Sequence, residues 1–108
     1  MDKHSVIGID LAKRSIQVCL VNTSSNKVIK NKAVSSNKFL EHLSNVKPCR
    51  IFMESCSRAN YWARQLKPMG FEVQLISPQH VVRHRIGQKT DANDALAIAE
   101  AGLRTKMH

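Results

Sequence analysis

The run Ser5–Asp10, which reads SVIGID, decides the fold that the rest of the chain completes. It is short, apolar and rich in β-branched residues, a composition that favours a buried strand. Alternation places Ile7 and Ile9 on one face and Gly8 and Asp10 on the other, and Gly8 leaves room beside the carboxylate. We therefore predict a central strand that ends on an acid.

Two further strands follow and complete an antiparallel meander. Residues 15–21 alternate apolar and polar side chains and stop at the turn sequence of residues 22–26. Residues 27–34 carry lysines in alternation, which suits an edge strand because exposed charge discourages unwanted pairing. The first third of the chain therefore predicts three consecutive strands.

The remaining two thirds alternate helices and strands. We expect, in order, a helix over Phe39–Leu43 capped by Ser36 or Asn37, a strand at 50–54, a helix at 58–69, a strand at 71–76 and a helix from about 91 to 102. A basic stretch at 79–89 begins as a short helix and becomes a loop at Gly87. This order predicts a single α/β domain over residues 1–108, with a mixed five-stranded sheet of three antiparallel strands and then parallel βα units, and helices on both faces.

The charge balance indicates a polyanionic partner. Seventeen Lys and Arg residues face eight Asp and Glu residues, giving a net charge of +9 and a pI near 10.0. Phosphate backbones attract such chains by releasing counterions, although basic charge also serves solubility alone. Candidate phosphate contacts are Lys13, Arg14, Arg83, Arg85 and Lys89. Each of them could also be an ordinary solvated cation.

Three cysteines without CxxC spacing, Cys19, Cys49 and Cys56, argue against a disulfide framework and against a structural zinc site. We expect reduced, mostly buried thiols in a cytoplasmic protein. We expect no export and no membrane span, because residues near the N-terminus do not form a signal-peptide h-region and no apolar run is long enough to cross a membrane.

Four acids stand where they could share a cation. Asp10 and Glu54 each end a predicted strand, and Asp91 and Asp94 lie three residues apart at the start of the last helix, on one face. Carboxylates held together repel one another unless a cation joins them. We expect Asp10, Glu54 and at least one of the helix acids to share Mg²⁺ or Mn²⁺. Singly, each has a plainer interpretation, since Asp91 or Thr90 could cap the helix, Glu54 could be a solvated strand end and Asp10 a turn residue.

Two other pairs have a structural interpretation first. Tyr61 and Trp62 lie on the predicted helix at 58–69, where packing is commoner than base stacking. His80 and His84 could share a helix face as metal ligands, but no third ligand lies nearby in sequence, so surface positions are favoured.

The motifs Gly8–Lys13, Met53–Cys56, Tyr61–Trp62 and Lys89–Ala95, in this order, resemble those of the Piv/MooV-type DEDD transposases and DNA invertases, with their RNase H-like fold of the RuvC type. The resemblance covers nearly the whole chain but only the N-terminal part of the family's proteins. It places the family's four catalytic acids on Asp10, Glu54, Asp91 and Asp94. The chain departs from the pattern at Ser57, where members commonly have Gly, and we expect this to leave Glu54 undisturbed.

The resemblance implies a transposase or recombinase that cleaves and transfers DNA strands with Mg²⁺, acts as a homo-oligomer when full-length and, in its insertion-sequence members, uses a guide RNA. It also implies a C-terminal domain with a nucleophilic serine, without which this fragment would be inactive. Two alternatives stay open. A catalytically silent nucleic-acid-binding module would keep the basic surface without all four acids, whereas an actin-like ATPase half would need a glycine turn where this chain has Leu11–Arg14.

Overall fold

The structure, a computed structural model, describes residues 3–12 and 15–104, and a five-stranded sheet forms its centre. The strands are β1 (Ser5–Leu11), β2 (Ser15–Asn22), β3 (Val28–Ser35), β4 (Arg50–Glu54) and β5 (Glu72–Ile76). They lie in the order β3-β2-β1-β4-β5. The pairs β1–β2 and β2–β3 are antiparallel, and the pairs β1–β4 and β4–β5 are parallel. The predicted mixed sheet, with SVIGID as its middle strand, is confirmed.

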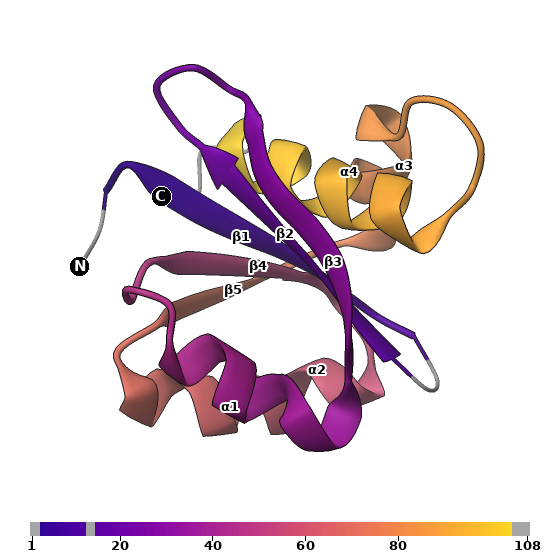
Figure 1. The fold of residues 1–108 in the computed structure, drawn as a ribbon. Helices are drawn as coiled ribbons and strands as arrows, with labels where there is room; N and C mark the ends of the chain where they lie inside the picture. The colour runs from indigo at the N-terminus through magenta and orange to yellow at the C-terminus, as the bar shows by residue number, and fades with distance from the viewer. Residues whose placement is uncertain (1–2, 13–14, 105–108) are drawn as a thin grey trace.

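Helices cover both faces of this sheet, as Figure 1 shows. One face carries α1 (Phe39–Ser44) and α2 (Ser57–Leu66), flanked by the short 3₁₀ helices η1 (Ser36–Lys38) and η2 (Lys67–Met69). The other face carries α3 (Pro78–His84) and α4 (Asp91–Arg104). The basic stretch therefore begins as a helix, as expected, and the loop after it contains Gly87 at φ 87°.

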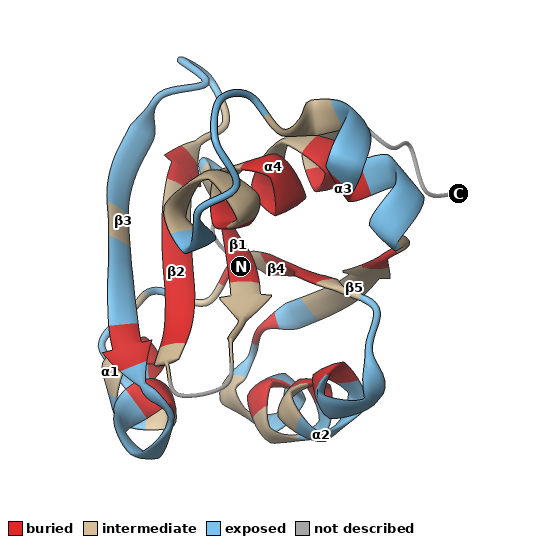
Figure 2. Ribbon diagram, turned by 90° about the vertical axis from the view of Figure 1, so that its right-hand side faces the viewer, coloured by how far each residue is buried: buried red, intermediate tan, exposed pale blue. Residues whose placement is uncertain are grey.

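Each face of the sheet has its own apolar core, visible as the buried segments of Figure 2. Alternation along β1 sends Ile7 and Ile9 towards α1 and α2, and Val6 towards α4. The Trp62 ring belongs to the first core, where it meets Phe39 edge-on with the ring centroids 5.0 Å apart. Its predicted packing role is confirmed.

The strand β3 forms an edge of the sheet, and most of its residues are exposed. A tight turn leads into it, in which the Asn22 side-chain oxygen accepts hydrogen bonds from the N–H groups of Ser24 and Ser25, each at 2.9 Å. Asn26 completes the turn with a left-handed φ of 60°. The edge position predicted from the lysine pattern is therefore confirmed.

Two of the three thiols are buried. Cys19 and Cys49 are buried, whereas Cys56 is exposed. Burial, with a smaller contribution from the charge of Glu100, raises the pKa of Cys19 to about 11, so its thiol stays protonated at neutral pH. Across residues 3–12 and 15–104, no helix has both the length and the apolar character that a membrane span requires.

Candidate metal centre

The first acid, Asp10, lies at the end of the central strand beside Glu54. The parallel register of β1 and β4 pairs Ile9 with Met53, so the next residues along the two strands, Asp10 and Glu54, stand at the same level. Phe52 belongs to the core beneath α4, and alternation gives Glu54 the same side as Phe52. Both strand acids therefore face the α4 side of the sheet, as the sequence predicted.

The second pair of acids starts α4, and neither is needed as its N-cap. The hydroxyl of Thr90 accepts a hydrogen bond from the N–H of Asn93 at 3.1 Å, which is the N-cap interaction. The N–H of Asp94 donates to the Thr90 carbonyl at 2.8 Å. Of the two capping candidates, Thr90 fills the role, and the carboxylates of Asp91 and Asp94 are left for another use.

Small residues bring α4 onto β1 and so join the two pairs. A Cβ on Gly8 would overlap the carbonyl oxygen of Ala95 and would lie 2.6 Å from the backbone nitrogen of Ala99. The absent side chain therefore makes room for the helix backbone itself. Since Asp94 directly precedes Ala95 and Asp10 lies two residues after Gly8, this contact sets the helix acids over the end of β1.

Three carboxylates consequently meet. One oxygen from each of Asp10, Asp91 and Asp94 lies within 4.8 Å of the others. The pKa of Asp10 is raised to about 6, first by burial and then, in decreasing order, by the charge of Asp91, the charge of Asp94, a hydrogen bond with Asp91 and the charge of Glu54. The protein thus holds negative charge together at a point where a cation would relieve the repulsion.

Glu54 does not join this three-acid cluster, so the expectation that it would share one cation with Asp10 and a helix acid is not met in that form. It lines a neighbouring cavity of about 280 Å³ with Asp10, Ser57 and Arg58. Ser57, the departure from the family pattern, simply begins α2. Glu54 is therefore close to the cluster, in the cavity beside the start of α2.

Arg58 supports this edge of the site, although no sequence motif pointed to it. Its guanidinium donates to the carbonyl of Leu11 at 2.6 Å and to that of Ala12 at 3.3 Å. These bonds hold the end of β1 immediately after Asp10. The sequence signal that could have identified Arg58 is its place as a basic residue in the first turn of the helix that follows Glu54.

Arg85 is paired within the site. Its Nη1 lies 3.2 Å from Oδ1 of Asp94, and the two side chains are 27% and 16% exposed. The sequence suggested Arg85 as a phosphate contact and did not foresee this partner. In this structure the guanidinium neutralises one of the three clustered acids.

The other predicted cations and the histidine pair contribute no ligand to the cluster within residues 3–12 and 15–104. Arg83 on α3 and Lys89 before α4 are exposed, whereas Lys13 and Arg14 lie outside the described residues. In the described part of the chain, the acid cluster is the one group of three metal-ligating side chains, and neither histidine of α3 belongs to it. His80 is exposed, as favoured.

The chain is similar to bacterial transposases over nearly its whole length. The model of the IS110-type DEDD family, described as "Transposase", matches residues 7–108. The transposase for insertion sequence element IS1111A of Coxiella burnetii is 39% identical over 107 residues, covering 99% of this chain and 29% of that protein. A probable family 20 transposase of Pseudomonas aeruginosa is 40% identical over 103 residues, covering 95% and 30%. The transposase for IS1328 of Yersinia enterocolitica is 37% identical over 108 residues, covering 100% and 32%, so the chain spans less than a third of these relatives.

Two solved structures share the fold. RuvC of Thermus thermophilus in complex with a Holliday junction substrate has a TM-score of 0.66 and 16% identity, covering 90% of both chains. A second RuvC structure from the same organism also has a TM-score of 0.66, with 15% identity over 90% of this chain and 91% of that one. At this identity the likeness shows the fold alone, which is RNase H-like of the RuvC type. With that fold and with the family match over residues 7–108, the chain belongs to the IS110-type DEDD transposases.

Proposed function

We propose that this chain is the N-terminal catalytic domain of a transposase that cleaves and transfers DNA strands with the help of a divalent metal ion. The observation that carries the proposal is the three-acid cluster, in which oxygens of Asp10, Asp91 and Asp94 lie within 4.8 Å of one another. Membership of a transposase family and a net charge of +9 support it. The assignment of Asp10, Glu54, Asp91 and Asp94 as catalytic acids belongs to this proposal.

The donor set fits Mg²⁺ or Mn²⁺, because hard cations prefer carboxylate oxygens. Asp10 would hold the ion from the rigid centre of the sheet, and Asp91 and Asp94 would hold it from the first turn of α4. Glu54, in the adjoining cavity beside the start of α2, would supply a further oxygen. When bound, the ion would stabilise the negative charge that develops on a phosphodiester during cleavage.

DNA is the partner that the charge and the fold support. The RuvC structure described above was solved with a Holliday junction, a branched DNA, and the present domain has the same fold. Lys89, exposed just before α4, and Arg83, exposed on α3, would contact phosphates of the bound DNA. Lys13, Arg14 and Arg85 complete the proposed set. A guide RNA and a homo-oligomeric full-length protein remain predictions from the family resemblance.

We further propose that residues 1–108 form one domain of a longer enzyme. The curated relatives are more than three times as long as the part that this chain matches. A second domain with a serine nucleophile would complete strand transfer. On this view the 108-residue chain binds metal but does not recombine DNA by itself.

Metal binding provides the direct test. Titration of Mn²⁺ into the chain, followed by calorimetry, should show binding that Asp10→Ala abolishes. The matched control is Glu72→Gln, because Glu72 is an exposed acid at the start of β5, far along the sheet from the strand ends that carry Asp10 and Glu54. Equal, negligible binding by wild type and Asp10→Ala would overturn the metal site.

A catalytically silent nucleic-acid-binding module is the second candidate. The ion pair between Arg85 and Asp94 favours it, since it neutralises one acid without a metal. The position of Glu54 outside the three-acid cluster also favours it. This candidate predicts nucleic-acid binding that neither Mn²⁺ nor Asp10→Ala changes.

A further inference from the structure

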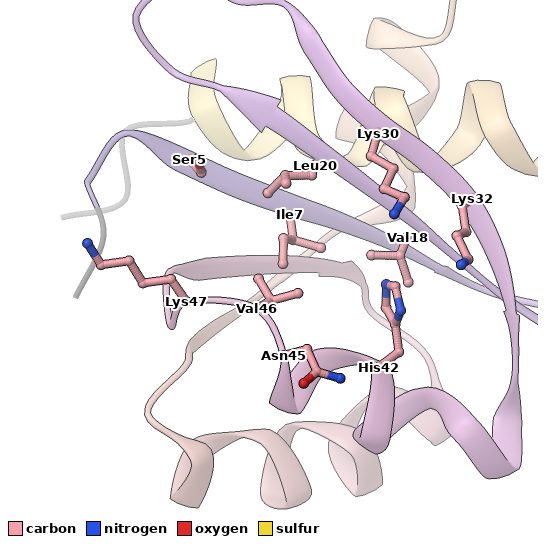
Figure 3. Close-up of a pocket in the computed structure, with 10 residues that line it drawn as sticks. All are labelled: Ser5, Ile7, Val18, Leu20, Lys30, Lys32, His42, Asn45, Val46 and Lys47. Atoms are coloured by element: carbon pink, nitrogen blue, oxygen red, sulfur yellow. The ribbon is translucent and has the colours of Figure 1, made fainter.

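A second cavity, of about 510 Å³, opens on the face of the sheet opposite the acid cluster, and Figure 3 shows its lining. It lies over β1, β2 and β3, beside the end of α1. The cavity exists because α1 has six residues and ends at Ser44, so the helix does not extend over the start of β1. The segment Asn45 to Lys47, which follows α1, forms part of the wall of the cavity.

The base of the cavity is apolar, and lysines continue it towards the sheet edge. Strand register pairs Ile7 with Leu20 and Leu20 with Lys30, and it pairs Val18 with Lys32. Paired residues on neighbouring strands share a face, so both lysines stand beside aliphatic side chains. Lys30 and Lys32 direct their ammonium groups over this apolar base (Figure 3).

Positive charge around the cavity has no acidic partner. Lys30, Lys32 and Lys47 line it together with His42, and no Asp or Glu belongs to the lining. In the part of the chain that the structure describes, no ion pair joins these lysines to an acid. Burial, and then the charges of Lys32 and Lys30, lower the pKa of His42, so its imidazole is neutral at neutral pH. The cavity therefore offers cations at its rim and neutral polar groups inside.

We propose that this lysine groove, defined by Lys30, Lys32, His42, Asn45 and Lys47 over its apolar base, binds single-stranded nucleic acid. Phosphates would lie at the lysines, and one unpaired base would enter the cavity and rest on the aliphatic side chains. The imidazole and the side-chain amide in its wall offer hydrogen-bonding groups to the edge of that base. The bases of a duplex are stacked and cannot enter, so single strands are preferred.

A nucleic acid fits the groove better than an acidic protein segment. A nucleobase can enter a concave pocket of this size, whereas a helix would lie across its rim and leave the polar groups in the wall without partners. The proposal rests on the proposed function in one respect, namely that the domain binds nucleic acid. It adds a contact on the opposite face from the acid cluster, so the strand held here is not the segment being cut.

Fluorescence anisotropy with labelled 20-nucleotide oligo-dT and oligo-rU, in EDTA, tests the proposal. The double variant Lys30→Gln/Lys32→Gln should weaken binding about tenfold and reduce the salt slope by about 1.4, since each phosphate contact to a single strand contributes about 0.7. The control Arg64→Gln/Lys67→Gln removes the same charge from exposed positions of α2 and η2 outside the cavity lining and should change affinity less than about twofold. Equal losses in both double variants would overturn the proposal, as would the absence of binding by wild type. The ratio of dT to rU affinity identifies the preferred strand.

A second comparison uses one added charge. Asn45→Glu puts an acid at the cavity wall and should weaken oligonucleotide binding, whereas Asn60→Glu on the exposed side of α2 should not. Equally tight binding of a blunt duplex, or displacement of the oligonucleotide by poly-glutamate, would refute the proposal in favour of another partner. Because EDTA removes metal, failure here leaves the Mn²⁺ titration unaffected, and failure of that titration leaves this assay interpretable.

Discussion

Replacing Asp10 by Asn should stabilise the metal-free domain at pH 7. The pKa of Asp10 is raised from 3.8 to about 6, so its ionised form is disfavoured in the folded state. An acid whose pKa is raised in the folded state contributes stability that is fully present below the unfolded pKa of 3.8. This stability is lost as the pH rises through the folded pKa of about 6. Asn cannot ionise, and therefore the variant keeps the stability that the wild type loses as Asp10 becomes charged.

The size of the effect follows from the same shift. A rise from 3.8 to about 6 corresponds to about 3 kcal/mol at 1.36 kcal/mol per pKa unit. Asp10 is half-buried, and solvent screening reduces this to about 1–2 kcal/mol. The lowered pKa of His42 gives its contribution to stability the opposite dependence on pH. The difference between variant and wild type removes that common contribution.

Urea denaturation followed by circular dichroism in EDTA, at intervals from pH 4 to pH 8, measures this difference. We expect the two proteins to diverge as the pH rises from 4 to 7, with Asp10→Asn the more stable. Saturating Mg²⁺ should then reverse the order, because a ligand at 100 times its Kd adds about 2.7 kcal/mol to the wild type alone. An Asp10→Asn protein that is less stable than wild type at pH 7 in EDTA would refute the electrostatic argument.

Two further substitutions test how the site is assembled. Gly8→Ala should destabilise the domain by about 3 kcal/mol and weaken Mn²⁺ binding, because its Cβ would push the α4 backbone off β1; unchanged urea stability would show that the helix does not depend on this contact. Arg85→Gln should increase Mn²⁺ affinity several-fold in calorimetry by freeing Asp94, whereas Arg83→Gln, an exposed change on α3, should not. If both arginine variants bind Mn²⁺ like wild type, Arg85 does not compete with the ion.

Much of the fold could be predicted because alternation and turn residues act locally. The SVIGID strand, the lysine-bearing edge strand and the switch from antiparallel to parallel pairing all followed from the order of short patterns. The function of Gly8 could not be predicted in this way. Sequence suggested that it gives space to the neighbouring carboxylate, but the space is taken by backbone from a helix nearly ninety residues away.

The candidate site shows the same division. Spacing could not decide whether Asp91 or Thr90 caps α4, since either side chain can reach the free N–H groups; the hydrogen bond to Thr90 decides it. Nothing in the sequence distinguishes Arg85 from other surface cations. The packing of α3 against α4 places it beside Asp94. The lysine groove depends on how α1 packs over the strands that line it, and no local pattern encodes that packing.

The sequence by itself determined the order of the strands along the chain, the excess of positive charge and the four acids to which the family resemblance points. Tertiary structure alone decided which acids meet. It joined Asp10 to Asp91 and Asp94 and left Glu54 in the adjoining cavity. The physical reason is that alternation fixes the face on which a side chain stands, whereas the distance between side chains on different elements depends on how closely those elements pack, here through the missing side chain of Gly8.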